Sequence, residues 1–148
     1  MDLFSEELIK TDYPAIDKKS CLAEMTEFLY ENNVITSQTD FYNAVLEREK
    51  IMSTGIGHKV AIPHAHSKVV KEFKAAVYLL DNELDFNSID GEPVKLVMML
   101  AVPEIFQNKY MKVLSKISNF LRNEEKREKL LCAKNAKEAL LILESMEL

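Results

Sequence analysis

Two short apolar runs constrain the fold of this chain more than any other feature. Residues 74–80 read KAAVYLL and residues 96–102 read LVMMLAV, and polar, turn-forming residues bound both runs. Each run is too short for a buried helix, and its apolar residues are continuous rather than alternating. Continuous apolar runs of this length are typical of strands buried on both faces. The sequence therefore predicts a small sheet with a covering layer on each side.

Helical periodicity precedes and follows these runs. Apolar residues recur at helical spacing over residues 17–31, and Ser37 with Asp40 three positions later indicates a capped start for a second helix ending near residue 50. A third helix is predicted over residues 109–121, and Asn135 opens a final one. The predicted core positions of these helices are Leu22, Met25, Phe28, Leu29, Phe41, Val45, Leu46, Tyr110, Val113, Leu114, Ile117, Leu121, Leu140 and Leu143. Helices on both sides of a sheet define the α/β class.

Composition narrows the class of protein. The chain has 148 residues without a repeat or a low-complexity linker, so we expect one domain over residues 1–148. The net charge of −5 disfavours binding to nucleic acid. No apolar stretch approaches the length that spans a bilayer, so no membrane insertion is expected. Cys21 and Cys132 stand far apart in the sequence, which favours a reducing, cytoplasmic location.

The chemistry-bearing residues cluster in residues 53–68, STGIGHKVAIPHAHSK, which indicate a loop, a short strand over residues 60–62 and a second loop. Two of the three glycines, Gly55 and Gly57, lie in this segment. A backbone shaped by glycine can present its amides to an anion, and the hydroxyl of Thr54 and the guanidinium of Arg48 suit phosphate oxygens. The alternative is a glycine that ends a helix beside a solvated arginine.

His64 follows Pro63, whose fixed φ stiffens the end of the predicted strand. A neutral imidazole is a competent nucleophile near pH 7 when one ring nitrogen is hydrogen-bonded and the other is exposed. The alternative is a histidine that only caps a strand. His64 and His66 could also form part of a metal site, but no third ligand lies at a suitable spacing, so we expect no metal.

No nucleotide-binding or hydrolase motif occurs in the sequence, so a phosphoryl group would have to arrive by contact with another protein. The segment EREKIMSTGIGHKVAIPHA, residues 47–65, resembles the signature of EIIA components of the fructose/mannitol class (EIIA type 2) in the bacterial phosphoenolpyruvate-dependent sugar phosphotransferase system (PTS). The resemblance extends to DFYNAVLERE, FNSIDGEPVKLV and MKVLSKIS elsewhere in the chain.

This resemblance implies an α/β sandwich with a central mixed sheet. It also implies a phosphotransferase that works without a cofactor. Its phosphohistidine, at His64, takes the phosphoryl group from the phosphocarrier protein HPr and passes it to a sugar-specific EIIB, which acts with the membrane component EIIC. Arg48 would neutralise phosphate charge, and the loop from Thr54 through Gly55 to Gly57 would border the site.

One position departs from the family pattern. Many relatives carry a second histidine where Tyr110 opens the predicted helix of this chain. Tyr110 or His66 would then replace it, or transfer would proceed without it; a phenol can donate a hydrogen bond to phosphate. Two other functions remain open alongside sugar transport: a regulatory EIIA-like module of the nitrogen-PTS type, and a metal-dependent hydrolase using His64 and His66.

Overall fold

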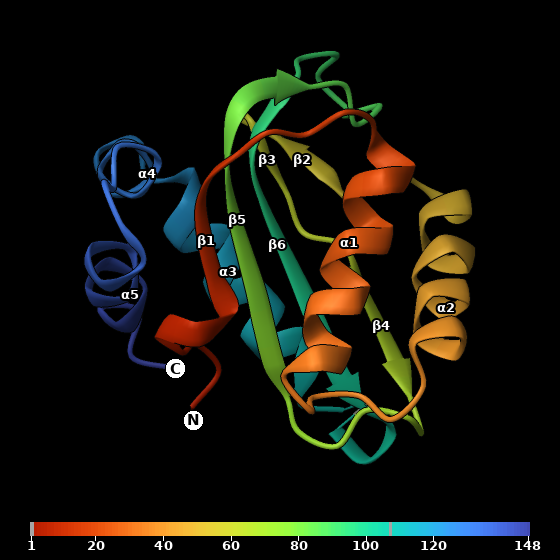
Figure 1. Cartoon of the computed structure of the whole chain (residues 1–148). Coiled ribbons are helices and arrows are strands. Elements are labelled where there is room, and N and C mark those ends of the chain that lie inside the picture. Colours follow the sequence, from red (N-terminus) through yellow and green to blue (C-terminus); the bar gives the residue numbers. More distant parts are fainter. Residues whose placement is uncertain (1, 107) are drawn as a thin grey trace.

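A mixed β-sheet forms the centre of the molecule (Figure 1). The computed structural model describes residues 2–106 and 108–148. Within them the sheet has six strands in the order β1-β5-β6-β3-β2, and β4 also pairs with β6. The strands are β1 (Ile9–Tyr13), β2 (Gly55–Gly57), β3 (Val60–Ala61), β4 (His64–Ser67), β5 (Lys74–Leu84) and β6 (Val94–Pro103). The pairs β1·β5, β3·β6 and β4·β6 are parallel, whereas β2·β3 and β5·β6 are antiparallel, which confirms the mixed sheet.

Helices cover both faces of this sheet, as predicted (Figure 1). They are α1 (Lys18–Glu31), α2 (Gln38–Ile51), α3 (Tyr110–Arg122), α4 (Glu124–Leu131) and α5 (Ala136–Glu144), with short 3₁₀ helices η1 (Glu6–Leu8) and η2 (Glu104–Phe106). Two of the helices begin at the predicted caps, where Ser37 accepts the backbone N–H of Asp40 and Asn135 that of Glu138. Asp17 caps α1 in the same way, by accepting the backbone N–H of Ser20. Such caps satisfy amides that a helix start leaves unpaired.

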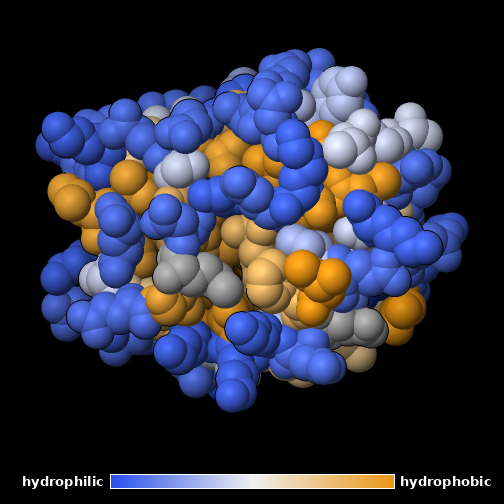
Figure 2. Space-filling model, turned by 90° about the horizontal axis from the view of Figure 1, so that it is seen from below, coloured by the Kyte–Doolittle hydropathy of each residue, from blue (hydrophilic) through white to orange (hydrophobic). Residues whose placement is uncertain are grey.

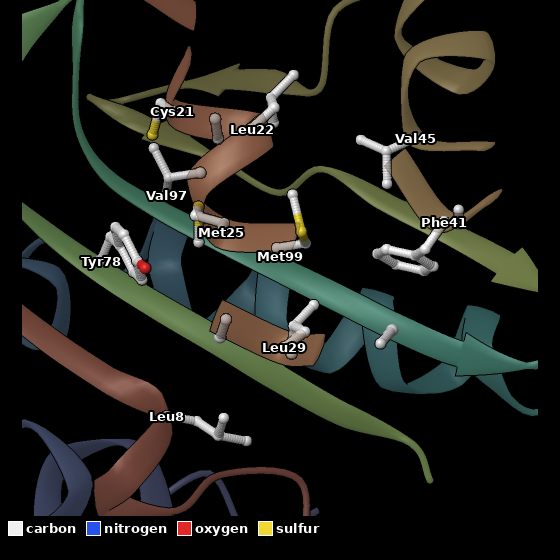
Figure 3. Packing of buried hydrophobic residues seen from close by; sticks show 14 of the residues in the cluster. Leu8, Cys21, Leu22, Met25, Leu29, Phe41, Val45, Tyr78, Val97 and Met99 are labelled. Atoms are coloured by element: carbon white, nitrogen blue, oxygen red, sulfur yellow. The ribbon is translucent and has the colours of Figure 1, made fainter. Parts of the chain in front are cut away.

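The two central strands explain why their sequences are apolar without interruption. In β5, Ala76 and Tyr78 pack with α1 and α2, whereas Val77 and Leu79 pack with the C-terminal helices. Because successive side chains of a strand point to opposite faces, both sets must be apolar when both faces are covered. Figure 3 shows the first of these cores, in which Phe41 of α2 and Met99 of β6 are both fully buried.

The segment at residues 53–68 is more regular than predicted. The strand expected at 60–62 is present as β3, but the prediction of loops on either side of it is wrong, since residues 55–57 form β2 and residues 64–67 form β4. Val60 pairs with Leu96 and His64 pairs with Leu100, so β3 and β4 follow β6 in one register. They are two halves of one strand, interrupted at Pro63, which has no N–H to donate.

The two glycines of this segment meet residues 88–90. A Cβ on Gly55 would lie 2.9 Å from the Cα of Ser88, and the Gly55 carbonyl accepts the N–H of Ile89. Gly57 has a φ of +95°, a conformation that L side chains rarely adopt. Gly55 is therefore required by the close packing of β2 against this neighbouring segment, and Gly57 by its backbone conformation.

Candidate functional site

His64 begins β4, at the edge of the sheet, and only 7% of its surface is exposed. Its Nδ1 lies 2.9 Å from the carbonyl oxygen of Ile62. A carbonyl oxygen can only accept a hydrogen bond, so Nδ1 must carry the proton in the neutral ring. The Nε2 lone pair of His64 is therefore the one available for chemistry.

The interruption of the strand makes the Ile62 carbonyl available for this contact. The carbonyl of Pro63 accepts the N–H of Leu100 in β6, at 2.9 Å. Successive carbonyls of an extended chain point to opposite sides, so the carbonyl of Ile62 faces away from β6. The N–H of Ile62 is also held on that side, by the carbonyl of Thr54 at 2.9 Å. The local backbone thus fixes the acceptor that orients His64.

A hollow of about 150 Å³ lies beside the ring of His64. Four of the predicted site residues line it: Arg48 from α2, His64 and His66 from β4, and Tyr110 from the first turn of α3. Ala44 and Ala65 complete the wall. The hollow lies beside β4 at the edge of the sheet, and helices of both covering layers, α2 and α3, contribute residues to its wall.

Tyr110 lies against both histidines. Its ring centroid is 4.0 Å from that of His66 in an edge-to-face arrangement, with an interplanar angle of 68°, and 6.1 Å from that of His64. The Nε2 of His66 is buried without a hydrogen-bond partner among the described residues. The hollow therefore contains two imidazoles and a phenol in direct proximity.

Charge and burial act together on His64. Burial is the largest influence and lowers the pKa of His64 below its ordinary value of 6.5. The hydrogen bond to Ile62 raises that pKa, Arg48 and His66 lower it, and Glu49 raises it. The pKa of His66 is also lowered by burial. Both imidazoles are therefore neutral near pH 7, as a nucleophilic nitrogen requires.

Arg48 lies in the last turn of α2, where its Nη1 donates to the carbonyl of Met52 at 2.8 Å. This contact ties the guanidinium to the end of the helix, and Arg48 also lines the hollow, with further N–H donors on its guanidinium. An anion bound in the hollow would therefore lie next to the guanidinium of Arg48.

The predicted loop residues lie elsewhere. Thr54, Gly55 and Gly57 are buried and are not part of the wall of the hollow. The Thr54 hydroxyl donates to the carboxylate of Glu49, and the two glycines pack against residues 88–90. His58 is exposed, with its N–H bonded to Asp90. These residues therefore lie in the segment that carries His64, but Thr54 bonds to Glu49 and the two glycines pack against residues 88–90 rather than facing the hollow.

Glu49 was missed by the sequence analysis. Its side chain is only 5% exposed; it forms an ion pair with the Lys18 ammonium at 3.2 Å and accepts hydrogen bonds from Thr54. A glutamate in a helix that also contains exposed Glu47 and Lys50 gives no local sign of burial. Only its position next to Arg48, at the helix end that borders the histidine segment, could have singled it out.

Neither a metal cluster nor a membrane-spanning helix is seen in the described ranges. No three His, Cys, Asp or Glu side chains come together there as a metal ion would need. None of the helices in residues 2–106 and 108–148 combines the length and the apolar character that crossing a bilayer requires.

Comparison with known proteins identifies the family. The family described as "Phosphoenolpyruvate-dependent sugar phosphotransferase system, EIIA 2" matches residues 2–146. The chain belongs to this EIIA family. EIIA domains transfer phosphoryl groups, and the EIIA fold is the mixed sheet and helical covering layers described above.

Both transport and regulatory EIIA proteins are similar to this chain. The fructose-specific EIIABC component of Bacillus subtilis is 33% identical over 90% of the chain, which spans about a fifth (21%) of that longer protein. A nitrogen regulatory protein of Bradyrhizobium diazoefficiens is 31% identical over 96% of the chain and 92% of its own length.

Solved EIIA structures have the same fold. The nitrogen regulatory protein IIA-Ntr of Neisseria meningitidis superposes with a TM-score of 0.90 at 31% identity, covering 96% of this chain and 97% of its own. Mannitol enzyme IIA of Escherichia coli, solved in complex with phosphorylated mannitol enzyme IIB, gives a TM-score of 0.81 at 22% identity, over 97% of each chain.

Proposed function

We propose that this EIIA protein, one domain over residues 1–148, is a cytoplasmic phosphocarrier whose phosphorylated atom is Nε2 of His64. The supporting observation is the contact between His64 Nδ1 and the Ile62 carbonyl, which leaves Nε2 with the lone pair. Phosphorylated HPr is the donor and a sugar-specific EIIB is the acceptor, which acts with the membrane component EIIC.

The chemistry is two displacements at phosphorus. In the first, the lone pair of His64 Nε2 attacks the phosphoryl group of HPr in line, the P–Nε2 bond forms, and the P–N bond to the HPr histidine breaks. In the second, a thiolate of EIIB attacks, and the electron pair of the P–Nε2 bond returns to His64. The proton stays on Nδ1 of His64, hydrogen-bonded to the Ile62 carbonyl, throughout, so the ring leaves as a neutral imidazole.

The other residues of the hollow stabilise the transferring group. The Arg48 guanidinium interacts with the equatorial oxygens, whose charge grows in the transition state. Tyr110 replaces the second histidine of many relatives, because its ring lies against both His64 and His66 and its hydroxyl can donate to phosphate. Partner proteins docked over the hollow exclude water, which protects the labile P–N bond.

Exposed apolar side chains near the hollow support docking of a protein partner. Ile51 and Met52 follow Arg48 at the end of α2, and Ile105 and Met111 flank Tyr110 in the sequence; all four are more than half exposed. Figure 2 shows the end of the molecule that carries the C-terminal end of β4, where apolar side chains interrupt a largely hydrophilic surface; the C-terminal end of α2 lies at the opposite end in Figure 1. The complex of mannitol enzyme IIA with phosphorylated enzyme IIB supports an EIIB as the occupant.

The decisive experiment is phosphorylation in a purified mixture. The protein is incubated with phosphoenolpyruvate, Enzyme I and HPr, and its intact mass is measured for the wild type, His64→Ala and His66→Ala. We expect one phosphate adduct on the wild type and on His66→Ala, and none on His64→Ala. An equal adduct on the wild type and His64→Ala would exclude His64 as the acceptor.

A regulatory role is the second candidate, and the comparisons favour it at least as strongly as transport. The nitrogen regulatory proteins of Bradyrhizobium and Neisseria match nearly their whole length. In this case the phosphorylation state of His64 signals to a partner protein, and no sugar is phosphorylated. Sugar phosphate produced in a mixture with a cognate EIIB and EIIC supports transport, whereas a partner that binds only one phosphorylation state of this protein supports regulation.

A further inference from the structure

We propose that Glu49 is a positioning residue for His64, acting through Thr54 and Ile62. This inference rests on the proposed function of His64. It assigns a role to a buried carboxylate that does not line the hollow and does not meet the transferring phosphoryl group.

The first step is the anchoring of Glu49 itself. The carboxylate is paired with the Lys18 ammonium at 3.2 Å. Lys18 also donates to the carbonyl of Phe86 at 3.2 Å and lies 4.6 Å above the centre of its ring. The Glu49 carboxylate is thus held between the start of α1, the end of α2 and the segment after β5. A buried charge with these partners has little freedom to move.

The second step is the set of hydrogen bonds that Thr54 donates to Glu49. Both Glu49 carboxylate oxygens lie 3.1 Å from the N–H of Thr54, and one of them also accepts its hydroxyl. Charge-assisted hydrogen bonds are stronger than neutral ones, so Glu49 fixes both the backbone and the side chain of the residue that precedes β2. Thr54 is 4% exposed, so water does not compete for these bonds.

The third step connects Thr54 to the imidazole. The carbonyl of Thr54 accepts the N–H of Ile62 at 2.9 Å, and the carbonyl of Ile62 is 2.9 Å from Nδ1 of His64. The residue that orients His64 is therefore held on its other side by Thr54. The peptide at Ile62–Pro63 lies where β3 and β4 are interrupted, so the sheet alone does not fix it.

This connection predicts that Glu49 controls the tautomer and the orientation of the His64 ring. With the contacts of Thr54 intact, the Ile62 carbonyl keeps the proton on Nδ1 of His64 and the lone pair on Nε2. When Thr54 is released, the carbonyl turns and the His64 ring populates both tautomers and more than one orientation. A fraction of molecules then presents a protonated Nε2, which cannot attack phosphorus.

The test compares Glu49→Gln and Thr54→Val with two controls. Gln is isosteric but replaces one acceptor oxygen with a donor, and Val has the shape of Thr without its hydroxyl. Thr54→Ser keeps the hydroxyl and is expected to restore wild-type behaviour. Glu47→Gln removes an exposed carboxylate from the same helix and is expected to leave the His64 tautomer and the rate unchanged, since the Glu47 side chain is 74% exposed and pairs with the exposed Lys50.

The primary measurement is the ¹⁵N spectrum of the imidazoles in the unphosphorylated protein. In the wild type, His64 is expected to be the Nδ1–H tautomer alone. In Glu49→Gln and Thr54→Val, it is expected to be a mixture of the Nδ1–H and Nε2–H tautomers. The initial rate of phosphoryl acceptance from HPr is expected to fall about tenfold in both variants, as for a misoriented nucleophile. Circular dichroism verifies folding, and if Glu49→Gln fails to fold, the Thr54→Val and Thr54→Ser pair decides.

Two outcomes separate this inference from the proposed function. If the folded variants retain the pure Nδ1–H tautomer and the wild-type rate, Glu49 does not position His64, whatever His64 does. If the wild type takes no phosphoryl group from HPr, the proposed function fails, while the tautomer measurement in the free protein still reports on the connection from Glu49 to His64.

Discussion

The rings of His66 and Tyr110 lie edge to face, with their centroids 4.0 Å apart, although 44 residues separate them in the sequence. This pair forms one side of the hollow beside His64. An aromatic side chain that packs in this way is held in one orientation by its neighbour. The phenol at residue 110 is therefore a fixed part of the candidate site.

Removing the Tyr110 hydroxyl should slow phosphoryl transfer without unfolding the protein. Tyr110→Phe keeps the ring contact with His66 and loses only the donor to phosphate. A hydrogen bond to a charged group contributes about 1.5 kcal/mol, so we expect a loss of about tenfold in the rate of acceptance from HPr. Stopped-flow or quenched-flow phosphorylation measures it, with Tyr30→Phe, an exposed tyrosine on α1, as the control. An unchanged rate in Tyr110→Phe would rule out a role for the hydroxyl.

Replacing Arg48 should have opposite effects on the reactivity and the pKa of His64. Arg48→Gln removes a donor to the transferring group, and we expect the transfer rate to fall about 100-fold. Because the guanidinium lowers the pKa of His64, the same substitution should raise that pKa. NMR titration of His64 measures the second effect, and Arg122→Gln at the exposed end of α3 is the control. A pKa that stays the same or falls in Arg48→Gln contradicts the prediction.

The rate of acceptance should depend on pH through His64. Burial lowers the pKa of His64 below 6.5, so the reactive neutral ring persists at pH values where an ordinary histidine is protonated. The rate should fall only as the pH drops through this lowered pKa. Initial rates and the NMR titration of His64 should give the same midpoint. A rate that has already halved at pH 6.5 is the contrary result.

The same shift links pH to stability. The unfolded chain takes up a proton on His64 near pH 6.5, while the native ring resists protonation until a lower pH. The free energy of unfolding should therefore be fully retained above pH 6.5 and decrease as the pH falls through the native pKa. His66 acts in the same direction, because its pKa is lowered too. Urea unfolding at several pH values, compared between the wild type and His64→Gln, should show a shallower slope in the variant.

Glycine at position 55 should be required for packing, and glycine at position 91 only for its backbone conformation. A Cβ on Gly55 would lie 2.9 Å from the Cα of Ser88, a backbone atom that cannot rotate away, so Gly55→Ala should cost about 3 kcal/mol and slow transfer by displacing Thr54. Gly91 has a φ of +75° and no neighbour within 4 Å of an added Cβ. Gly91→Ala should cost about 1 kcal/mol and leave transfer unchanged. Equal effects of the two substitutions on transfer would contradict this reading.

The core between α1, α2 and the sheet should respond strongly to truncation. Phe41 is fully buried among residues of this core, so Phe41→Ala should lower the free energy of unfolding by about 3–5 kcal/mol (Figure 3). Ile16 is 86% exposed, and Ile16→Ala should change it by less than about 0.5 kcal/mol. Urea denaturation of both variants measures the difference. A loss below about 1 kcal/mol in Phe41→Ala would mean that this core is not tightly packed.

Features that depend on neighbouring residues were predictable from the sequence. The helix starts at Asp17, Ser37 and Asn135 each need only an acceptor side chain three positions before a backbone N–H. The strands β5 and β6 follow from continuous apolar character, since that pattern is stable only with both faces covered. Arg48, His64, His66 and Tyr110 were also predicted to share one site, Arg48, His64 and Tyr110 from the family resemblance and His66 from its spacing to His64.

The short strands and the hydrogen bonds of the candidate site depend on residues far apart in the sequence. β1, which was not predicted, owes its form to pairing with β5, and β4 owes its form to pairing with β6. A strand of four or five residues has no intrinsic stability in water, so its partner decides whether it exists. For the same reason the sequence predicted that the Thr54 hydroxyl would bind phosphate, whereas in the structure it donates a hydrogen bond to Glu49.

The sequence by itself therefore determined the layers of this protein, the starts of the helices that follow Ser37 and Asn135, and the histidine that we propose as the phosphoryl acceptor, because periodicity, caps and a motif all lie in consecutive residues. Only the tertiary structure decided that Nδ1 of His64 binds the Ile62 carbonyl, and that Tyr110 lies against His66. Hydrogen bonds and ring contacts act over a few ångströms, and distances of that kind between separate strands and helices are fixed only when the chain has packed.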